Sequence, residues 1–373
     1  MPKLLYLVTE DWFFVSHFLP MARAARAAGL EVVVATRLRE QATGIAAEGF
    51  RTVSLESERR SLGPIEIGRS IARMAAIVRA ERPDIVHCIA LRMVALGGLA
   101  AKAAGARALV LAPTGLGHLW IENGPVERIG RAATRAVVGR WLRGPRTRYL
   151  FENRDDPREF GLDPDGPDVT LIGGAGVAAD AAAPTAEPPA PPLRVAVVSR
   201  MLRPKGIAEA VAAARRAREL GAAVELSLYG TPDPSNRRSC SEAELRAWSA
   251  EPGVAWRGRT DDVAGVWRGH HVAMLLSYRE GTPRSLVEAA AAGRPIVATD
   301  VPGCREVVRD GIEGLLVPAR DTEQAAQALV RLAGDAALRA RMGAAAHARF
   351  RAAFTEEAVG RAVTGLYREL LAR

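Results

Sequence analysis

Residues 271–300, HVAMLLSYREGTPRSLVEAAAAGRPIVATD, contain two short apolar runs separated by a polar loop and an amphipathic segment. HVAMLLS predicts a buried strand, a helix is expected from about Pro283 to Ala292, and PIVATD predicts the next strand. Continuous apolar strands that alternate with helices are typical of parallel βαβ units covered on both faces. This stretch therefore predicts an α/β fold with a parallel sheet.

The same alternation extends through both halves of the chain. LRVAVVS (193–199) restarts it in the second half, and KLLYLVT, EVVVAT and DIVHCIA predict strands in the first half. Residues 181–192, AAAPTAEPPAPP, are rich in proline and alanine and are predicted to form a linker. We therefore expect two Rossmann-like lobes, residues 1–180 and 193–354, that face a cleft where ligands bind at the strand ends.

Composition excludes several classes of protein. The three cysteines, Cys88, Cys240 and Cys304, are widely spaced and form no metal-ligand motif, which favours a cytoplasmic protein without a zinc site. MPKLLYLVTEDW leads directly into a strand pattern, so we expect no signal peptide. No stretch reaches the roughly 20 apolar residues that span a bilayer. The net charge of +9 fits either a solvated surface or an anionic partner, and no nucleic-acid-binding motif accompanies it.

Two glutamates in the quoted stretch, Glu280 and Glu288, stand out by their context rather than by their spacing. Glu280 follows a predicted strand, and Glu288 lies in the helix that comes next. Thr282 is predicted to cap this helix and Pro283 to occupy its first position. The N–H groups of such a first turn form an anion site. A bound phosphate would favour Arg284 there, although Arg284 could also extend into solvent.

A basic loop follows the first strand of the second half. VVSRMLRPKG (197–206) contains Arg200, Arg203 and Lys205, and a helix is expected to begin directly after Gly206. Cations at the carboxyl end of a parallel strand are placed to meet anions. Arginine offers phosphate a planar fork and lysine a mobile point charge. The loop therefore predicts a phosphate-binding function.

Together, SRMLRPKG (199–206) and EGTPRSLVEAAAAGRPIVATDVPG (280–303) resemble glycosyltransferase family 4, the retaining enzymes of the GT-B fold. The likeness is strongest to the bacterial branch that extends capsule, lipopolysaccharide or glycan precursors. PDIVHCIALR, TGLGHLW and FENRDD in the first half resemble the same branch, so the resemblance covers about residues 3 to 330. It implies two Rossmann-like lobes, and we expect a C-terminal helix, about 355–373, to pack back onto the first.

The resemblance also implies roles for single residues. Arg200 and Lys205 would hold the diphosphate of a nucleotide-sugar donor, Glu280 would contact the sugar hydroxyls, and Glu288 the ribose. We predict Glu280, Lys205 and Arg200 as catalytic residues, because charge on the departing diphosphate must be stabilised. The family generally needs no metal or other cofactor, and Asp163 with Asp165 in DPDG is interpreted as a turn. The other predicted donor-site residues are Gly230, Arg259 near the base, Gly281, Thr282, Pro283, Arg284 and Ser285.

The first lobe is expected to bind the acceptor, with less support from motifs. Trp12, Phe13 and Phe14 follow the first strand and could be core residues or could cradle a lipid-linked or ring-stacked acceptor. Nearby Ser16 and His17 are further candidates. His87 and His118 lie near the ends of predicted strands or loops, where each could bond the acceptor or be a core histidine. The complete acceptor-side set is Trp12, Phe13, Ser16, His17, His87 and His118.

Residues 128–148, RIGRAATRAVVGRWLRGPRTR, contain seven arginines and no acidic residue. Apolar residues lie between the arginines, a pattern that fits either a helix at an anionic membrane surface or the solvent face of an ordinary helix. If the segment contacts membrane, the acceptor could be a polyprenyl-diphosphate-linked sugar at the inner face of the cell membrane.

These features predict a retaining enzyme that transfers a hexose or N-acetylhexosamine from a UDP-sugar to a surface-polysaccharide or polyprenyl-diphosphate-linked glycan, forming an α linkage. Two alternatives remain open. A two-lobed nucleotide-sugar epimerase or hydrolase would use a similar donor site without an acceptor. A catalytically inactive scaffold of a membrane assembly would keep the fold without binding a UDP-sugar.

Overall fold

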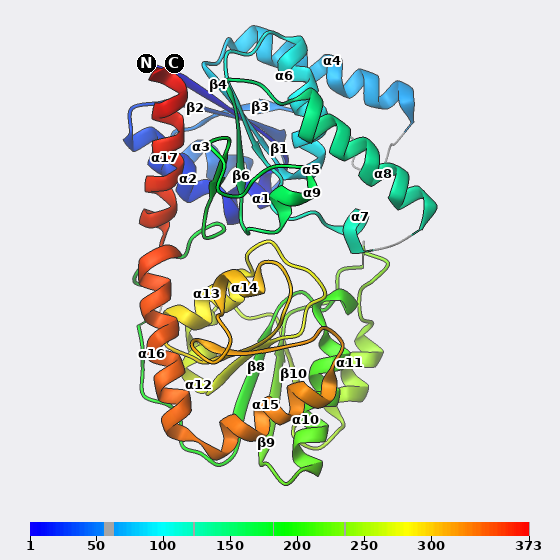
Figure 1. Ribbon diagram of the computed structural model, residues 1–373, viewed down its shortest axis with the longest axis vertical. Coiled ribbons are helices and arrows are strands. Elements are labelled where there is room, and N and C mark those ends of the chain that lie inside the picture. Colours follow the sequence, from blue (N-terminus) through cyan, green and yellow to red (C-terminus); the bar gives the residue numbers. More distant parts are fainter. Residues whose placement is uncertain (56–62, 122–123, 182, 235, 373) are drawn as a thin grey trace. The chain divides into compact units, whose positions relative to one another are not determined.

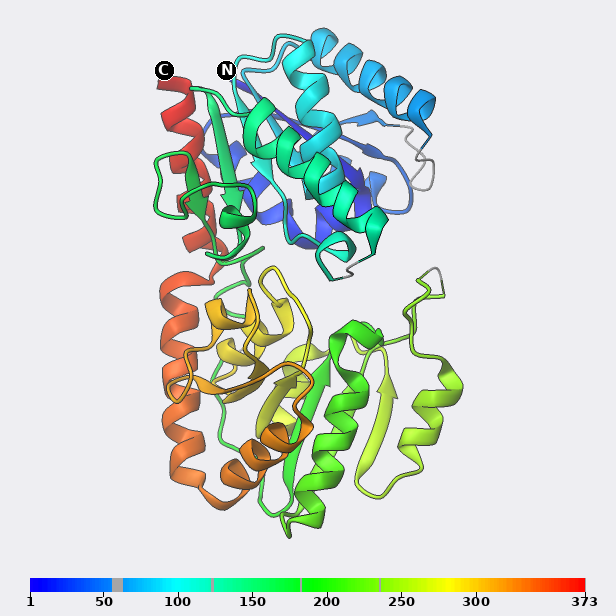
Figure 2. The same ribbon diagram turned by 45° about the vertical axis from the view of Figure 1, so that its right-hand side comes forward.

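The computed structural model describes residues 1–55, 63–121, 124–181, 183–234 and 236–372 of the chain (Figure 1). The chain divides into two compact units. The first lobe comprises Met1–Gly176 together with Glu356–Arg373, and the second lobe comprises Val177–Thr355. Each lobe is a parallel sheet with helices on both faces (Figures 1 and 2).

The first lobe has a seven-stranded parallel sheet in the order β3-β2-β1-β4-β5-β6-β7. Alternate residues of β1 enter different cores, because successive side chains of a strand point to opposite faces. Leu4 and Tyr6 pack on the face with α2 and α17, whereas Leu5 and Leu7 pack on the face with α4 and α6. The strands are β1 (Lys3–Glu10), β2 (Glu31–Arg37), β3 (Arg51–Ser54), β4 (Ile85–Ile89), β5 (Leu109–Ala112), β6 (Thr147–Phe151) and β7 (Val169–Leu171). The helices are α1 (Asp11–His17), α2 (Leu19–Ala27), α3 (Ala42–Ala47), α4 (Pro64–Glu81), α5 (Ala90–Arg92), η1 (Met93–Gly97), α6 (Gly98–Ala103), α7 (His118–Ile121), α8 (Pro125–Ala136), η2 (Val137–Trp141), α9 (Asp156–Glu159) and α17 (Glu356–Ala372).

The second lobe has a six-stranded parallel sheet in the order β10-β9-β8-β11-β12-β13. One face packs on α10 and α15, and the other on α12, α13 and α16. The strands are β8 (Leu193–Val198), β9 (Val224–Tyr229), β10 (Val254–Gly258), β11 (Val272–Leu275), β12 (Ile296–Thr299) and β13 (Gly314–Val317). The helices are η3 (Arg203–Lys205), α10 (Ile207–Glu219), α11 (Glu242–Ser249), α12 (Val263–Gly269), α13 (Arg284–Ala291), α14 (Cys304–Val307), α15 (Thr322–Gly334) and α16 (Ala336–Ala353).

Both sheets reverse their strand order beside their first strand. β1 lies between β2 and β4, and β8 lies between β9 and β11. Loops that leave the carboxyl ends of two such neighbouring strands diverge to opposite faces, and the crevice between them is where open α/β sheets bind ligands. In the second lobe this switch point lies between β8 and β11. Two Rossmann-like lobes are therefore present, as the sequence predicts.

The Pro/Ala-rich segment 181–192 is attached to the second lobe. Arg294 Nη2 donates to Thr185 Oγ1 at 2.6 Å, and Arg339 Nη2 donates to Glu187 Oε2 at 2.8 Å. Both guanidinium groups are buried and would be costly to leave without these acceptors. The segment has neither helix nor strand in its described residues, yet it satisfies buried charges of the lobe that follows it.

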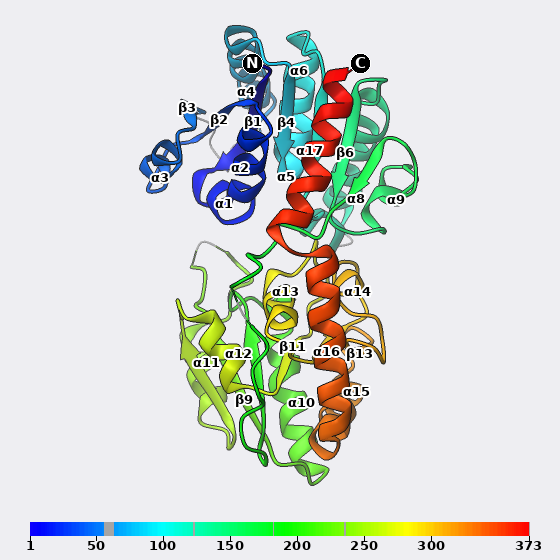
Figure 3. The same ribbon diagram turned by 90° about the vertical axis from the view of Figure 1, so that its left-hand side faces the viewer.

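The C-terminal helix α17 belongs to the first lobe, where it packs along α2 (Figure 3). Its buried Tyr367 hydroxyl lies 3.0 Å from the Tyr6 hydroxyl and 2.7 Å from His87 Nδ1. Arg148, a buried residue of β6, donates to Glu369 Oε1 at 2.7 Å. Polar bonds inside an apolar contact fix the register of this helix, because each unmade bond would leave a buried polar group without a partner.

Candidate active site

The two loops at the switch point of the second lobe touch each other. The loop after β8 spans 199–206, and the loop after β11 spans 276–283. Tyr278 N donates to Pro204 O at 2.9 Å. Gly206 has φ +71°, and a Cβ atom there would lie 2.1 Å from Leu276 O. Only glycine permits both this conformation and this approach, which explains why the loop ends in glycine.

Lys205 and Glu280 form an ion pair between these loops. Lys205 Nζ lies 2.5 Å and 2.8 Å from the two carboxylate oxygens of Glu280. The side chains are only 23% and 9% exposed, so water screens the pair weakly. Lysine is rare in this arginine-rich chain, which has only two others, Lys3 and Lys102. The site thus holds a compact ammonium with rotatable donors, in a chain whose usual cation is arginine.

The helix behind Glu280 begins one residue later than predicted. Pro283 is the N-cap of α13, so the prediction that Thr282 occupies the cap position and Pro283 the first position of the helix is wrong. Pro283 O instead accepts from Leu286 N at 3.0 Å and Val287 N at 3.2 Å. Residues Arg284 and Ser285 form the start of the helix, where N–H groups have no acceptor within the helix itself.

Glu288 lies one turn along α13 and pairs with Arg284. Arg284 Nε donates to Glu288 Oε1 at 2.9 Å. Burial raises the pKa of the Glu288 carboxyl above its ordinary value, and the charge of Arg284 partly opposes this shift. Arg284 thus stabilises the ionised form of a carboxylate that burial disfavours. The predicted contact of Arg284 with a bound anion remains a prediction. The structure shows that Arg284 also pairs with Glu288.

Glycines hold the backbone around the site. Gly303, with φ +83°, precedes α14, and a Cβ atom there would lie 1.7 Å from Gly281 O. The turn at Gly303 therefore supports the loop that carries Glu280. Gly230 has φ +140°, and a Cβ atom there would lie 1.8 Å from Ser199 O. The chain's own backbone thus already requires glycine at 230, and the predicted donor contact of Gly230 remains a prediction.

Arg200 and Arg259 are more exposed than the Lys205–Glu280 pair and bond elsewhere. Arg200 Nη1 lies 3.5 Å from Asp233 Oδ2, and Arg259 Nη2 lies 3.1 Å from Asp261 Oδ1. Arg200 nevertheless lies in the same loop as Lys205. Surface pairs of this kind exchange readily for another anion, because each contributes about 0–1 kcal/mol.

The acceptor-side candidates on α1 follow β1, at the switch point of the first lobe. Phe14 is buried and is a core residue, whereas Trp12 is exposed. Phe13 is half-buried, with its ring centroid 4.5 Å from that of His17. Ser16 Oγ donates to Trp12 O at 2.8 Å and lies 2.6 Å from His17 Nδ1. The three aromatic residues therefore divide between core and surface.

His87 is a core residue, which corrects its prediction as an acceptor contact. It lies inside β4 with no exposed surface, and its Nδ1 is bonded to the Tyr367 hydroxyl. Burial lowers its pKa to about 3, so the ring is neutral. His118 begins α7, but its side chain lies outside the described part of the structure.

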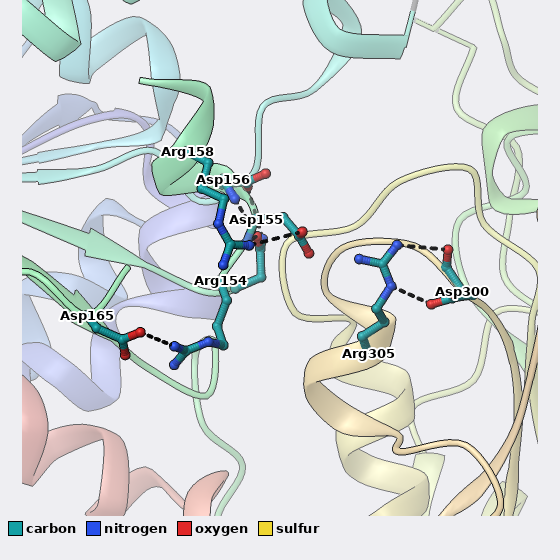
Figure 4. A network of polar contacts seen from close by, with 8 residues as sticks. Arg154, Asp155, Asp156, Arg158, Asp165, Asp300 and Arg305 are labelled. Carbon is teal, nitrogen blue, oxygen red and sulfur yellow. Dashed lines mark hydrogen bonds and ion pairs between the residues drawn. The ribbon is translucent and has the colours of Figure 1, made fainter. Parts of the chain in front are cut away.

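The DPDG segment is a turn, and Asp165 of this turn points toward Arg154 (Figure 4). Asp163 Oδ1 accepts from Asp165 N at 3.0 Å, and Asp165 pairs with Arg154 at 2.5 Å. Asn153 Nδ2 donates to Asp156 Oδ2 at 3.0 Å. Figure 4 also draws the Arg305–Asp300 pair of the second lobe. These carboxylates are thus used in turns and ion pairs of the protein itself.

The basic segment 128–148 is only partly a solvent face. It forms most of α8, then η2 and the beginning of β6. Arg135 pairs with Glu159, Arg143 lies 3.4 Å from Asp168, and Arg148 is buried. Several of its arginines therefore serve the first lobe internally. Ile129 and Trp141 are the exposed large apolar residues of this segment, and the exposed Val126 lies just before it on α8.

The sequence interpretation did not single out three residues that hold loops at the switch points of the two sheets. Asp11 is buried after β1, and its Oδ2 accepts from the N–H groups of Arg39 at 2.7 Å and Gln41 at 3.0 Å. It joins the loops after β1 and β2. Gly303 and Tyr278 are the other two. A glycine directly before a helix and an aromatic residue two positions before Glu280 are signals that would have drawn attention to them.

Two family models match the chain over most of its length. One described as "Glycosyl transferases group 1" matches residues 192–335, and one described as "Glycosyl transferase 4-like" matches residues 3–136. The D-inositol 3-phosphate glycosyltransferase of Streptomyces bingchenggensis is 38% identical over 86 residues, which are 23% of this chain and 19% of that protein. The chain matches between 19% and 37% of the length of such relatives.

Other similar proteins align over nearly the whole chain. The N,N'-diacetylbacillosaminyl-diphospho-undecaprenol alpha-1,3-N-acetylgalactosaminyltransferase of Campylobacter jejuni is 23% identical over 342 residues, which are 87% of this chain and 88% of that protein. The structure of sucrose-phosphate synthase from Thermosynechococcus elongatus has a TM-score of 0.80 at 21% identity and covers 100% of this chain and 99% of that one. Anabaena Alr3699/HepE in complex with UDP has a TM-score of 0.77 at 14% identity, with 99% and 100% covered. The two structures show the shared fold, the GT-B fold of two Rossmann-like lobes, and the two family models show that the chain belongs to glycosyltransferase family 4.

Proposed function

We propose that the chain is a retaining glycosyltransferase that moves a hexose or N-acetylhexosamine from a UDP-sugar to a polyprenyl-diphosphate-linked or surface-polysaccharide glycan, forming an α linkage. The observation that carries this proposal is the Lys205–Glu280 pair, held by two interlocked loops at the switch point of the second lobe. The name of the Campylobacter relative, which aligns over 87% of the chain, describes a transferase acting on an undecaprenol-linked acceptor.

The chemistry requires charge stabilisation more than a nucleophile. The bond from the sugar C1 to the diphosphate oxygen breaks, and C1 bonds to the acceptor oxygen on the same face. The acceptor proton passes to the departing diphosphate, so the atoms and charges balance. Lys205, Arg200 and the N-terminus of α13 would stabilise the negative leaving group.

The two glutamates would orient the donor. Glu280 holds Lys205 in place before the donor binds, and its carboxylate would then also accept bonds from sugar hydroxyls. Glu288, kept ionised with the help of Arg284, would accept from the ribose hydroxyls. A carboxylate accepts two hydroxyl donors at once, which suits a vicinal diol.

We propose that turnover needs no bound metal ion, because Lys205, Arg200 and the helix N-terminus supply the positive charge that the diphosphate requires. Transfer in a chelator should equal transfer in added Mg²⁺. A loss of activity in the chelator that Mg²⁺ restores would contradict this part of the proposal.

We also propose that α8 and η2 contact an anionic membrane at its cytoplasmic face. Ile129, 71% exposed, and Val126 lie beside Arg128 on α8, and the exposed Trp141 follows Arg140 at the end of η2. Apolar anchors beside cations favour an anionic lipid surface. No helix in the described ranges is long and apolar enough to cross a bilayer.

A sedimentation assay with vesicles of phosphatidylglycerol tests the membrane contact. Ile129→Glu should weaken binding several-fold, whereas Ile65→Glu, at a site 70% exposed on α4 of the same lobe, should not. Binding should also fall as salt rises. Equal effects of the two variants, or salt-independent binding, would refute the contact.

Release of UDP from UDP-sugars tests the main proposal. Transfer predicts release that depends on a polyprenyl-diphosphate-linked acceptor, and loss of that release in Lys205→Met. Acceptor-independent release would indicate a hydrolase. Failure to bind any UDP-sugar would favour an inactive scaffold.

A further inference from the structure

Tyr278 makes three contacts that the proposed function leaves unexplained. Its N–H donates to Pro204 O at 2.9 Å, and its hydroxyl donates to Glu209 Oε1 at 2.5 Å. The Arg320 guanidinium lies 4.6 Å from the centroid of its ring. Tyr278 is half-buried in the loop after β11, two positions before Glu280.

The polar partners of Tyr278 lie on both sides of Lys205 in the chain. Pro204 directly precedes Lys205 in η3, and Glu209 lies in the first turn of α10, where the helix dipole favours a carboxylate. One tyrosine thus contacts the chain before and after the lysine. The close approach of Gly206 to Leu276 O lies between these two points.

The third partner is held in an unusual conformation. Arg320 has φ +68°, in the left-handed region that costs a side-chain-bearing residue about 1 kcal/mol or more. A cation over one face of an aromatic ring is attracted by the ring's electrons. Arg320 therefore restricts the ring of Tyr278 on one side while Glu209 fixes its hydroxyl.

We propose that Tyr278 is a positioning residue of the donor site, which sets Lys205 against Glu280 by tying the first turn of α10 to the loop after β11. This proposal rests on the proposed function for its catalytic consequence. Burial and the neighbouring Glu209 raise the pKa of the Tyr278 hydroxyl, which keeps it protonated as the donor of this bond. Without that bond, Lys205 loses its fixed place.

Amine labelling tests the placement of Lys205 without any enzyme assay. The chain has three lysines, so Lys3 and Lys102 serve as internal references. Tyr278→Phe should raise acetylation of Lys205 by acetic anhydride several-fold, read by mass spectrometry. Tyr149→Phe is the matched control, because it removes a hydroxyl bonded to Val138 O at 2.7 Å in the other lobe. Equal Lys205 labelling in Tyr278→Phe and wild type would overturn the proposal.

Kinetics test the consequence for transfer. Tyr278→Phe should lower kcat about 10- to 100-fold, as expected for a misplaced catalytic group, with the KM for the acceptor unchanged. Glu209→Ala should have a similar effect, and the double variant should be no worse than either single variant. If wild type transfers sugar, a normal kcat in Tyr278→Phe would overturn the proposal. A wild type without transfer would refute the proposed function alone, because labelling still decides the role of Tyr278.

Discussion

Replacing Lys205 by Met should destabilise the second lobe by about 2 kcal/mol. Breaking a fully buried ion pair costs about 3–5 kcal/mol, because the remaining charge has no partner. An exposed pair contributes about 0–1 kcal/mol. Lys205 is 23% exposed and Glu280 only 9%, with contacts of 2.5 and 2.8 Å, so the pair falls between these limits. Methionine keeps the length of the side chain and removes its charge.

Urea unfolding followed by tryptophan fluorescence measures this cost. A double-mutant cycle with Glu280→Gln should give a coupling free energy of about 1–2 kcal/mol, because the pair contributes once. The matched control is the pair Arg246–Glu242, which lies on α11 of the same lobe with both side chains largely exposed. Its coupling should be near zero. Equal coupling for the two pairs would refute the view that the Lys205–Glu280 pair is a tightly held part of the site.

Three further predictions concern other residues. Burial raises the pKa of Glu288, so the folded state binds this proton more tightly than the unfolded state and stability falls as pH rises from the ordinary pKa through the raised one. Glu288→Gln should therefore increase stability at neutral pH and flatten this pH dependence in urea titrations. The same variant should abolish UDP binding. Lower stability of Glu288→Gln than of wild type at neutral pH would contradict this prediction. Gly303→Ala should cost about 2 kcal/mol or more and weaken UDP binding in calorimetry, because its Cβ would lie 1.7 Å from Gly281 O; wild-type binding would show that the turn does not support the loop. Tyr367→Phe should cost about 1–3 kcal/mol in urea unfolding, because it leaves His87 Nδ1 buried without a partner; an unchanged midpoint would refute this.

The sequence was sufficient to predict the lobes and the central part of the candidate site. Apolar runs mark the strands, and cations or acids in the loops after two of them mark Lys205 and Glu280 as candidates. Strand order was the missing step: β8 and β11 lie side by side although two strands separate them in the chain. The family resemblance implied the joint role of these residues, and the structure supplies the contact between them.

Residues whose partners are distant in the chain were harder to interpret. His87 looks like a candidate at a strand end, but its partner Tyr367 comes 280 positions later, on a helix that returns to the first lobe. The sequence predicts that Arg284 contacts an anion. In the structure Arg284 has a local partner, Glu288, four residues later on the same helix. Local patterns do not show which face of an element another segment will cover.

The arginines of 128–148 illustrate the same limit. In the sequence they form one basic run, but Arg148 is buried in β6 and donates to Glu369 of the C-terminal helix. Arg135 and Arg143 pair with acids that lie after β6. Only the positions of the exposed apolar side chains show which part of α8 and η2 faces outward and which arginines bond within the lobe.

Acceptor-dependent release of UDP, compared between wild type, Lys205→Met and Arg246→Met, tests the central claim most directly. A panel of UDP-sugars is supplied with a polyprenyl-diphosphate-linked acceptor, and released UDP is measured in each case. The account predicts release by wild type and Arg246→Met with at least one UDP-sugar, and a loss of about 100-fold or more in Lys205→Met, as for other groups that stabilise charge in a transition state. Equal release by all three proteins would contradict it.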